Sequence, residues 1–225
     1  LAHKYKASEV LTGIEQDAIS VLVEVWRARL GDLSWYMRCL NEAVARMANE
    51  EEECTGRFWE GRFTSQALLD EAALISCMVY VDLNPIRACL SESLEDSEFT
   101  SIQERLIHNQ KKQRDTSTKT WLKPLAQRNK PLLSTDLPIE DTCYFDLVDW
   151  TGRAIRDDKR GAIPVHIQTI LKNVAVNEDN WVNNTQRFGS RFRRALGRIS
   201  QFKKLASRTN SKRINGLSPA KQFYK

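Results

Sequence analysis

The stretch DEAALISCMVYVDLNP, from Asp70 to Pro85, decides the fold of this chain. Asp70 is a favourable helix N-cap, and Glu71 suits the positive end of the helix dipole. Proline disfavours helical geometry in the residue before it, so Pro85 predicts that this helix ends near Leu83. Apolar residues at helical spacing predict one buried face, formed by Leu74, Ile75, Met78 and Val81.

Two more helices are predicted upstream. Residues 14–30 carry an apolar stripe expected to face a core, formed by Ile14, Ala18, Val21, Leu22 and Val25. After a break at Gly31-Asp32, Ser34 is the expected cap of a second helix, one face of which carries Tyr36, Leu40, Ala43, Val44 and Met47.

Residues 56–63, GRFWEGRF, follow neither the helical nor the strand period. They predict an irregular or short extended element with packed rings and free guanidinium groups. An ordinary packed connector is one interpretation of this composition. Cations beside aromatic rings, arranged for phosphates and stacked bases, are the other.

Composition favours a mainly helical chain. The 225 residues include only nine Gly and six Pro, and 41% are hydrophobic, so most of the chain can bury enough apolar surface to order itself. No apolar run approaches the length of a membrane-spanning helix, and the five cysteines include no C-x-x-C pair. A reducing cytoplasmic location is therefore expected.

Charge is unevenly distributed along the chain. Residues 1–104 hold nine Lys/Arg and nineteen Asp/Glu, whereas residues 187–225 hold twelve Lys/Arg and no Asp/Glu. A basic module of this kind is typical of polyanion binding, although a solvated tail is the simpler interpretation. Charge and apolar content together predict an acidic region over 1–104, a basic linker over 105–135, and a second small helical domain over 136–225. That domain would end in a basic amphipathic helix from Arg187 onward.

Few residues have the spacing of a catalytic site. Three histidines, His3, His108 and His166, are too scattered to form one site by spacing. Tyr80 and Asn84 are four residues apart, so a helix would place the phenol and the amide oxygen on one face. Taken alone, this pair is also consistent with a half-buried tyrosine beside a helix-terminating Asn-Pro.

Two strings in the sequence resemble a known family. They are FWEGRF, residues 58–63, and YVDLNPIRA, residues 80–88, and SWYMRCLNE, residues 34–42, agrees with them. Together they resemble the single-tyrosine HUH transposases, specifically the REP-associated tyrosine transposase branch. That branch has a W-x-x-R-F element followed by a Y-x-x-x-N-P-[VI]-[RK] helix end. The resemblance covers residues 14–105, and it implies that residues 1–104 are the C-terminal part of the transposase catalytic domain, with the tyrosine helix at about 70–84.

The resemblance implies a fold and a reaction. The family fold is an α+β domain in which helices flank an antiparallel sheet, and the tyrosine helix faces a His-hydrophobe-His motif on a central strand. By this matching, Tyr80 would attack a scissile DNA phosphate, forming a 5′-phosphotyrosine and releasing a 3′-hydroxyl. Asn84 would be the third ligand of Mg²⁺ or Mn²⁺, which are hard cations that prefer such oxygen ligands.

The sequence departs from the family at the metal site, because no His-x-His occurs in these 225 residues. With Leu1 as its first residue, the chain is expected to be the C-terminal part of such a transposase, its α+β fold truncated at the N-terminus, or to derive from a degenerate copy. No metal is expected to bind this chain tightly, and the chain is expected to be inactive alone.

The expected partner is DNA, single-stranded or folded into a hairpin, with no membrane involved and a homodimer left open. Residues expected to bind DNA are Arg57, Arg62 and Arg87 near the family strings, and Arg191, Arg194, Arg198, Lys203 and Lys204 in the basic tail. Two alternatives remain at this point. One is a non-catalytic DNA-binding protein on the same scaffold, and the other is a basic helical protein that binds RNA or a protein partner.

Overall fold

A computed structural model describes residues 2–6, 10–112, 121–127, 136–156, 163–192, 194–209 and 217–224. Contacts divide the chain into two units, Leu1–Thr64 and Ser65–Lys225, called here the N-terminal and C-terminal units. The boundary therefore lies well before the predicted linker at 105–135. Among the described residues, no helix combines the length and the apolar character needed to cross a membrane.

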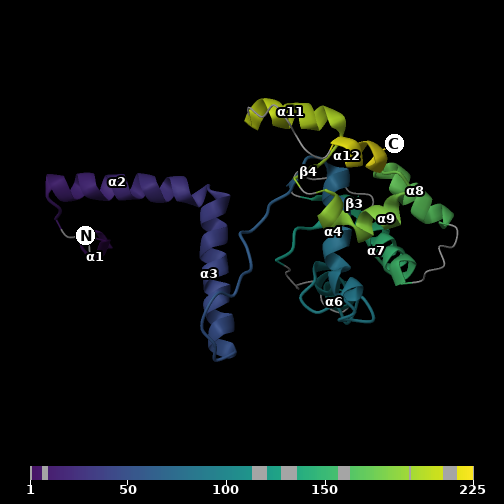
Figure 1. The fold of residues 1–225 in the computed structure, drawn as a ribbon, viewed down its shortest axis with the longest axis horizontal. Coiled ribbons are helices and arrows are strands. Elements are labelled where there is room, and N and C mark those ends of the chain that lie inside the picture. Colours follow the sequence, from purple (N-terminus) through teal and green to yellow (C-terminus); the bar gives the residue numbers. More distant parts are fainter. Residues whose placement is uncertain are drawn as a thin grey trace. The chain divides into compact units, whose positions relative to one another are not determined.

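The N-terminal unit contains α1 (Ala2–Lys6), α2 (Gly13–Leu30) and α3 (Leu33–Glu51). Thr12 and Glu15 form a capping box that starts α2, since each side chain accepts a hydrogen bond from the other residue's backbone N–H. The chain turns a corner after Gly31, and α3 extends in a new direction (Figure 1). Asp32 caps α3 by accepting a bond from the Ser34 N–H at 2.7 Å. The prediction that Ser34 is the cap was therefore wrong, because the helix begins two residues earlier than that cap would allow.

Four of the five residues of the predicted core-facing stripe of residues 14–30 are exposed, and Ala18 is half-buried. Ile14 is 84% and Val21 65% exposed, and no residue of α2 or α3 is buried. Both helices form as predicted, but within the described part of the N-terminal unit no third element covers the apolar face. Helical periodicity identified the element correctly and did not determine what packs against it.

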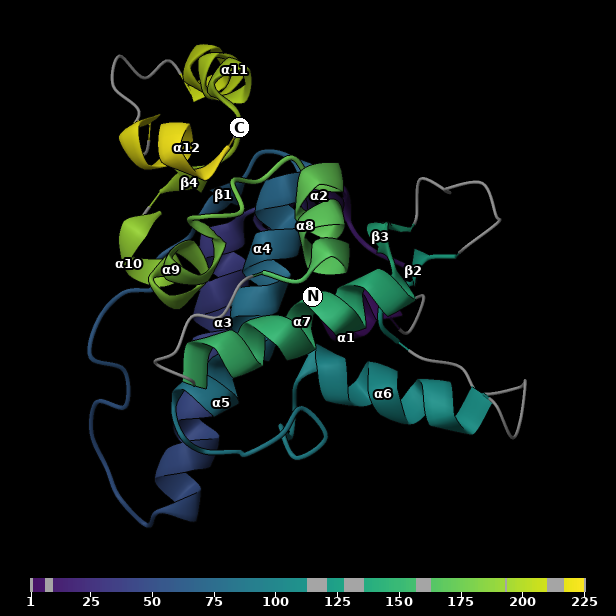
Figure 2. The ribbon, with the colours of Figure 1, turned by 90° about the vertical axis from the view of Figure 1, so that its right-hand side faces the viewer.

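The core of the C-terminal unit is built around α4 (Glu71–Asp82), which α7 (Asp141–Arg156) crosses (Figure 2). Asp70 caps α4 as predicted, and its carboxylate accepts a bond from the Ala73 N–H at 2.9 Å. The buried face is shifted from the predicted one. Ile75 and Val79 are buried, but Val81 is 54% exposed, because α7 and α9 (Trp181–Gln186) pack on α4 from two sides. The core also includes residues of α5 (Asn84–Arg87), α8 (Val165–Asn173) and α10 (Phe188–Arg191).

The described part of the chain is mainly helical, as predicted, and its strands pair only two at a time. Strand β1 (Ala67–Leu68) pairs in parallel with β4 (Ala195–Leu196), and β2 (Leu125–Ala126) pairs in parallel with β3 (Leu137–Glu140). The β1–β4 pair joins the segment before α4 to the basic tail. Residues 136–225 therefore share one core with α4 and do not form the separate domain that was predicted.

The predicted linker contains regular structure. Helix α6 (Ser101–Lys112) extends into it from a first turn that contains the fully buried Ile102, and Leu125 of β2 is buried as well. High charge and weak periodicity concealed these elements, because each contributes only one or two apolar side chains to the core. The rest of this interval, residues 113–120 and 128–135, lies outside the described residues.

The prediction that the basic tail forms one amphipathic helix was wrong. It consists of α10, β4, α11 (Ile199–Thr209) and α12 (Leu217–Phe223). The helix is interrupted because β4 pairs with β1 and Gly197 lies against Leu69, where an added Cβ would be 2.5 Å from the Leu69 Cβ. The apolar residues of the pattern are nevertheless buried, among them Phe188, Phe192 and Phe202.

Candidate functional site

Tyr80 lies on the last turn of α4 and is half-buried. Its ring stacks on that of Phe188, with centroids 5.2 Å apart and an interplanar angle of 29°. The guanidinium carbon of Arg87 lies 4.4 Å from the centroid of the Tyr80 ring. The tyrosine of the family-like string is thus held between a cation from α5 and an aromatic ring from α10.

The hydroxyl of Tyr80 approaches the backbone of Gly189. A Cβ at residue 189 would lie 2.9 Å from this oxygen and 3.6 Å from the ring carbon that bears it. Only glycine leaves room for the hydroxyl in this packing. Nothing in the local sequence predicts this role, because Tyr80 and Gly189 are far apart in the chain.

Asn84 is exposed and is the first residue of α5. Helix α4 ends at Asp82 with Leu83 as its C-cap, so the predicted end of the helix is correct. Asn84 itself is helical, although the following proline was expected to keep it extended. Pro85 itself is tolerated in α5 because it stands within the first turn, where a missing N–H costs no hydrogen bond.

Arg87 has internal contacts besides the Tyr80 ring. Its Nη2 donates to the carbonyl oxygen of Gln186 at 2.9 Å, and its buried Nη1 has no hydrogen-bond partner among the described residues. The guanidinium therefore links α5 to the end of α9 through Nη2, whereas Nη1 makes no hydrogen bond within the described residues. Its role as a DNA contact stays a prediction.

Asp82, between Tyr80 and Asn84 in sequence, has a structural role that the sequence analysis missed. Its buried carboxylate accepts bonds from the Ser101 hydroxyl at 2.9 and 3.0 Å and from the Ile102 N–H at 3.2 Å. The Tyr144 hydroxyl also donates to it. Burial, together with the neighbouring Asp82 charge, raises the pKa of Tyr144 well above its usual value. A charged residue inside an otherwise apolar stretch was the signal that could have revealed this buried, hydrogen-bonded group.

The donor set around Asn84 does not by itself fit a divalent cation. The Asp82 carboxylate is already used to hold α6 and Tyr144. Across the described ranges, no group of three or more His, Cys, Asp or Glu side chains is placed to hold an ion. Asn84 would supply one amide oxygen, and further ligands would have to come from elsewhere.

Arg57 and Arg62 belong to the N-terminal unit. The Nε of Arg57 donates to the Trp59 carbonyl oxygen at 2.8 Å, and the Trp59 indole N–H donates to the Asn41 carbonyl oxygen at 2.9 Å. The segment is irregular, as predicted, and the Trp59 ring packs edge-on against Phe58. Arg62 lines a pocket of about 420 Å³ together with residues of α3.

The five predicted DNA-binding residues of the tail differ in their surroundings. Arg191 donates to the Gln222 side chain and is partly buried, whereas the other four are exposed: Arg194, Arg198, Lys203 and Lys204. On α11 the adjacent Phe202 is buried, so the two lysines lie on the solvent side of that helix. The tail therefore presents cations to solvent while its apolar residues hold it to the core.

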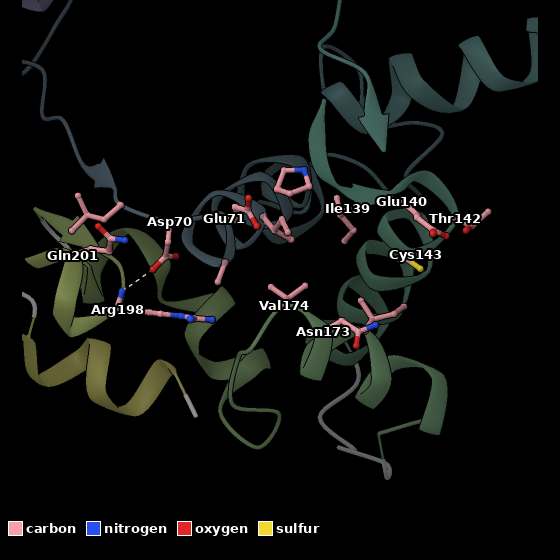
Figure 3. Close-up of a pocket in the computed structure, with 15 residues that line it drawn as sticks. Asp70, Glu71, Ile139, Glu140, Thr142, Cys143, Asn173, Val174, Arg198 and Gln201 are labelled. Carbon is pink, nitrogen blue, oxygen red and sulfur yellow. Dashed lines mark hydrogen bonds between the residues drawn. The ribbon is translucent and has the colours of Figure 1, made fainter. Parts of the chain in front are cut away.

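A pocket of about 820 Å³ opens beside the N-terminus of α4 (Figure 3). Its polar lining includes Asp70, Glu140 and Arg198, but neither Tyr80 nor Asn84 reaches it. The Asp70 carboxylate caps α4, accepts the Arg198 backbone N–H at 2.7 Å and accepts the Tyr224 hydroxyl at 2.6 Å. Burial, and the bond to Asp70, raise the pKa of Tyr224. Asp70 therefore serves to fasten the tail to α4.

Comparison with known proteins adds no relative: no protein-family model matches this sequence, and neither the curated proteins nor the solved structures contain a significant match.

Proposed function

We propose that this chain is part of a cytoplasmic DNA transposase of the single-tyrosine HUH type, which cleaves and rejoins single-stranded DNA through Tyr80. The observation that carries the proposal is the contact of the Arg87 guanidinium with the Tyr80 ring at the junction of α4 and α5, where Asn84 is the first residue of α5. A half-buried phenol, an exposed amide and a guanidinium whose buried Nη1 has no hydrogen-bond partner among the described residues lie within two helical turns.

The proposed reaction is a transesterification at phosphorus. The Tyr80 oxygen forms a bond to the phosphorus, the bond from phosphorus to the 3′ oxygen breaks, and that oxygen leaves as a 3′-hydroxyl after taking up a proton. The DNA strand stays attached to the protein through a 5′-phosphotyrosine. A guanidinium such as that of Arg87 is suited to stabilise the charge that develops on the phosphate oxygens.

A divalent cation would polarise the phosphate and assist a phenol whose usual pKa is about 10. Asn84 would be one ligand in such a site. Because the described donors do not complete a coordination shell, the steps assigned to this chain are those of Tyr80 and Arg87 alone.

A second function is favoured by the packing of Tyr80. Its ring is stacked on Phe188 and its hydroxyl lies against Gly189, so its surroundings are those of a packed side chain. A DNA-binding protein without cleavage activity would keep this arrangement and the exposed cations of the tail.

The deciding experiment uses a labelled single-stranded hairpin DNA with Mg²⁺ or Mn²⁺. A protein that joins these 225 residues to a His-hydrophobe-His strand is expected to form a covalent adduct that survives denaturing electrophoresis, whereas the 225 residues alone, with no His-x-His, are expected to form none. Tyr80→Phe should abolish the adduct and leave DNA binding intact. Tyr36→Phe, which changes an exposed tyrosine of α3, is the matched control and should keep the adduct. DNA binding without any adduct would support the second function, and an adduct that persists in Tyr80→Phe would refute the assignment of the nucleophile.

A further inference from the structure

The pocket of about 420 Å³ in the N-terminal unit combines aromatic rings with guanidinium groups. Its size falls within the range typical of small-ligand sites. The residues that line it come from the start of α3 and from the end of the GRFWEGRF segment: Asp32, Ser34, Trp35, Arg38, Asn41, Arg62 and Phe63.

Trp35 contacts two guanidinium groups, that of Arg38, which lines the pocket, and that of Arg29, which does not. The guanidinium carbon of Arg29 lies 4.0 Å from the centroid of the Trp35 ring, and that of Arg38 lies 5.0 Å from it. Cation–π contacts of this kind restrain long side chains without using their N–H donors. The donors of both arginines therefore remain available to a ligand.

The arginines at the pocket have no acidic partner, although the N-terminal unit is rich in carboxylates. Among the described residues, Arg29, Arg38 and Arg62 form no ion pair. In contrast, Arg27 and Arg46 each pair with a glutamate of their own helix. Arg38 and Arg62 both line the pocket, and these two guanidinium groups without an ion pair among the described residues indicate a site for an anion from outside the chain.

The remaining lining residues suit a planar group that carries amino hydrogens. Phe63 supplies an aromatic surface, and the Asp32 carboxylate, oriented by its bond to the Ser34 N–H at 2.7 Å, can accept a further hydrogen bond. A carboxylate in the lining would disfavour a free phosphate but suits the exocyclic amino group of a base. The guanidinium groups therefore suit the phosphate of a nucleotide, and Phe63 and Asp32 suit its unpaired base.

We propose that this pocket binds one unpaired nucleotide of single-stranded DNA, with its phosphate on Arg38 and Arg62 and its base against Phe63. The amino group of cytosine, adenine or guanine would donate to Asp32, so thymine, which has none, should bind less tightly. This inference rests on the proposed function, since it takes single-stranded DNA as the ligand.

The test measures binding of the full 225-residue chain to a fluorescein-labelled oligodeoxycytidine of twelve nucleotides by fluorescence anisotropy. Arg38→Gln and Arg62→Gln should each weaken binding about fivefold to tenfold, because each removes one phosphate contact. Arg46→Gln removes the same charge from the exposed surface of α3 and is the matched control, expected to change the affinity by less than about twofold. Circular dichroism of each variant reports whether α2 and α3 stay folded.

Base recognition is tested by comparing oligodeoxycytidine with oligothymidine and with an oligonucleotide of the same sequence made of RNA. Asp32→Asn keeps a capping side chain but changes the acceptor, so it should reduce the preference for cytosine over thymine. Equal affinities of Arg38→Gln, Arg62→Gln and Arg46→Gln would overturn the proposal that this pocket binds a nucleotide. The absence of any DNA binding would overturn it as well. A preference for the RNA oligonucleotide would overturn DNA as the ligand. If only the pocket proposal is wrong, the covalent adduct at Tyr80 still forms in the cleavage experiment. If only the proposed function is wrong, no adduct forms, but Arg38→Gln and Arg62→Gln still weaken DNA binding.

Discussion

The ring of Phe188 stacks on the ring of Tyr80, with the two centroids 5.2 Å apart. One ring belongs to the basic tail and the other to the helix that carries the family-like string. This contact makes the tail part of the wall around Tyr80. Because Phe188, Phe192 and Phe223 are all buried, deleting residues 187–225 would remove core side chains as well as charge. DNA binding by the tail should therefore be tested with point substitutions and not by deletion.

Gly189→Ala should destabilise the C-terminal unit. The new Cβ would lie 2.9 Å from the Tyr80 hydroxyl oxygen, and such overpacking costs about 1–3 kcal/mol of unfolding free energy. Urea denaturation followed by circular dichroism measures the loss. The control is the same substitution made together with Tyr80→Phe, which removes the clashing oxygen and leaves the ring carbon at an ordinary 3.6 Å. An equal loss of unfolding free energy in the wild type and in Tyr80→Phe would contradict the close contact between the Tyr80 hydroxyl and residue 189.

Tyr144→Phe should lower the unfolding free energy by about 1–2 kcal/mol, since it removes a hydrogen bond to a buried carboxylate. Asp82→Ala should cost more, because it leaves the Tyr144 hydroxyl, the Ser101 hydroxyl and the Ile102 N–H without their acceptor. Denaturant titrations of the two variants give the order of the effects. A smaller loss for Asp82→Ala than for Tyr144→Phe would show that the carboxylate does not organise this contact.

The stability of the C-terminal unit should fall in alkaline solution. The pKa of Tyr144 is raised in the folded state, so the folded chain keeps a proton that the unfolded chain releases near pH 10. This contribution is fully present below about pH 10 and is lost as the pH rises above it. Thermal melts between about pH 8 and about pH 11 should show a smaller decline in Tyr144→Phe than in the wild type. Tyr36→Phe, at an exposed position, should decline as the wild type does.

Lys203→Gln and Lys204→Gln should each weaken DNA binding and flatten its salt dependence. Each neutralised phosphate contributes about 0.7 to the slope of log affinity against log salt for a single strand. The double variant should therefore lose about twice that slope. Anisotropy titrations at several salt concentrations give the slopes. Arg153→Gln, an exposed α7 residue paired with Asp149, is the control, and an equal effect there would indicate a general charge effect.

Local sequence determined α4 and both of its ends. The Asp70 cap, the Pro85 stop and the helix between them are properties of neighbouring residues, and they appear as predicted. The irregular GRFWEGRF segment follows equally from its glycines and the absence of a period. The spacing of Tyr80 and Asn84 is likewise fixed by the sequence.

Only the tertiary structure decided what these elements contact. The break in the tail arises because β4 pairs with β1 and Gly197 packs on Leu69, contacts between residues far apart in the chain. The same holds for the stack of Phe188 on Tyr80, the burial of Asp82 and the exposure of the α2 stripe. Helical period and capping depend on residues within one or two turns, whereas burial depends on which distant surface is available to cover a face.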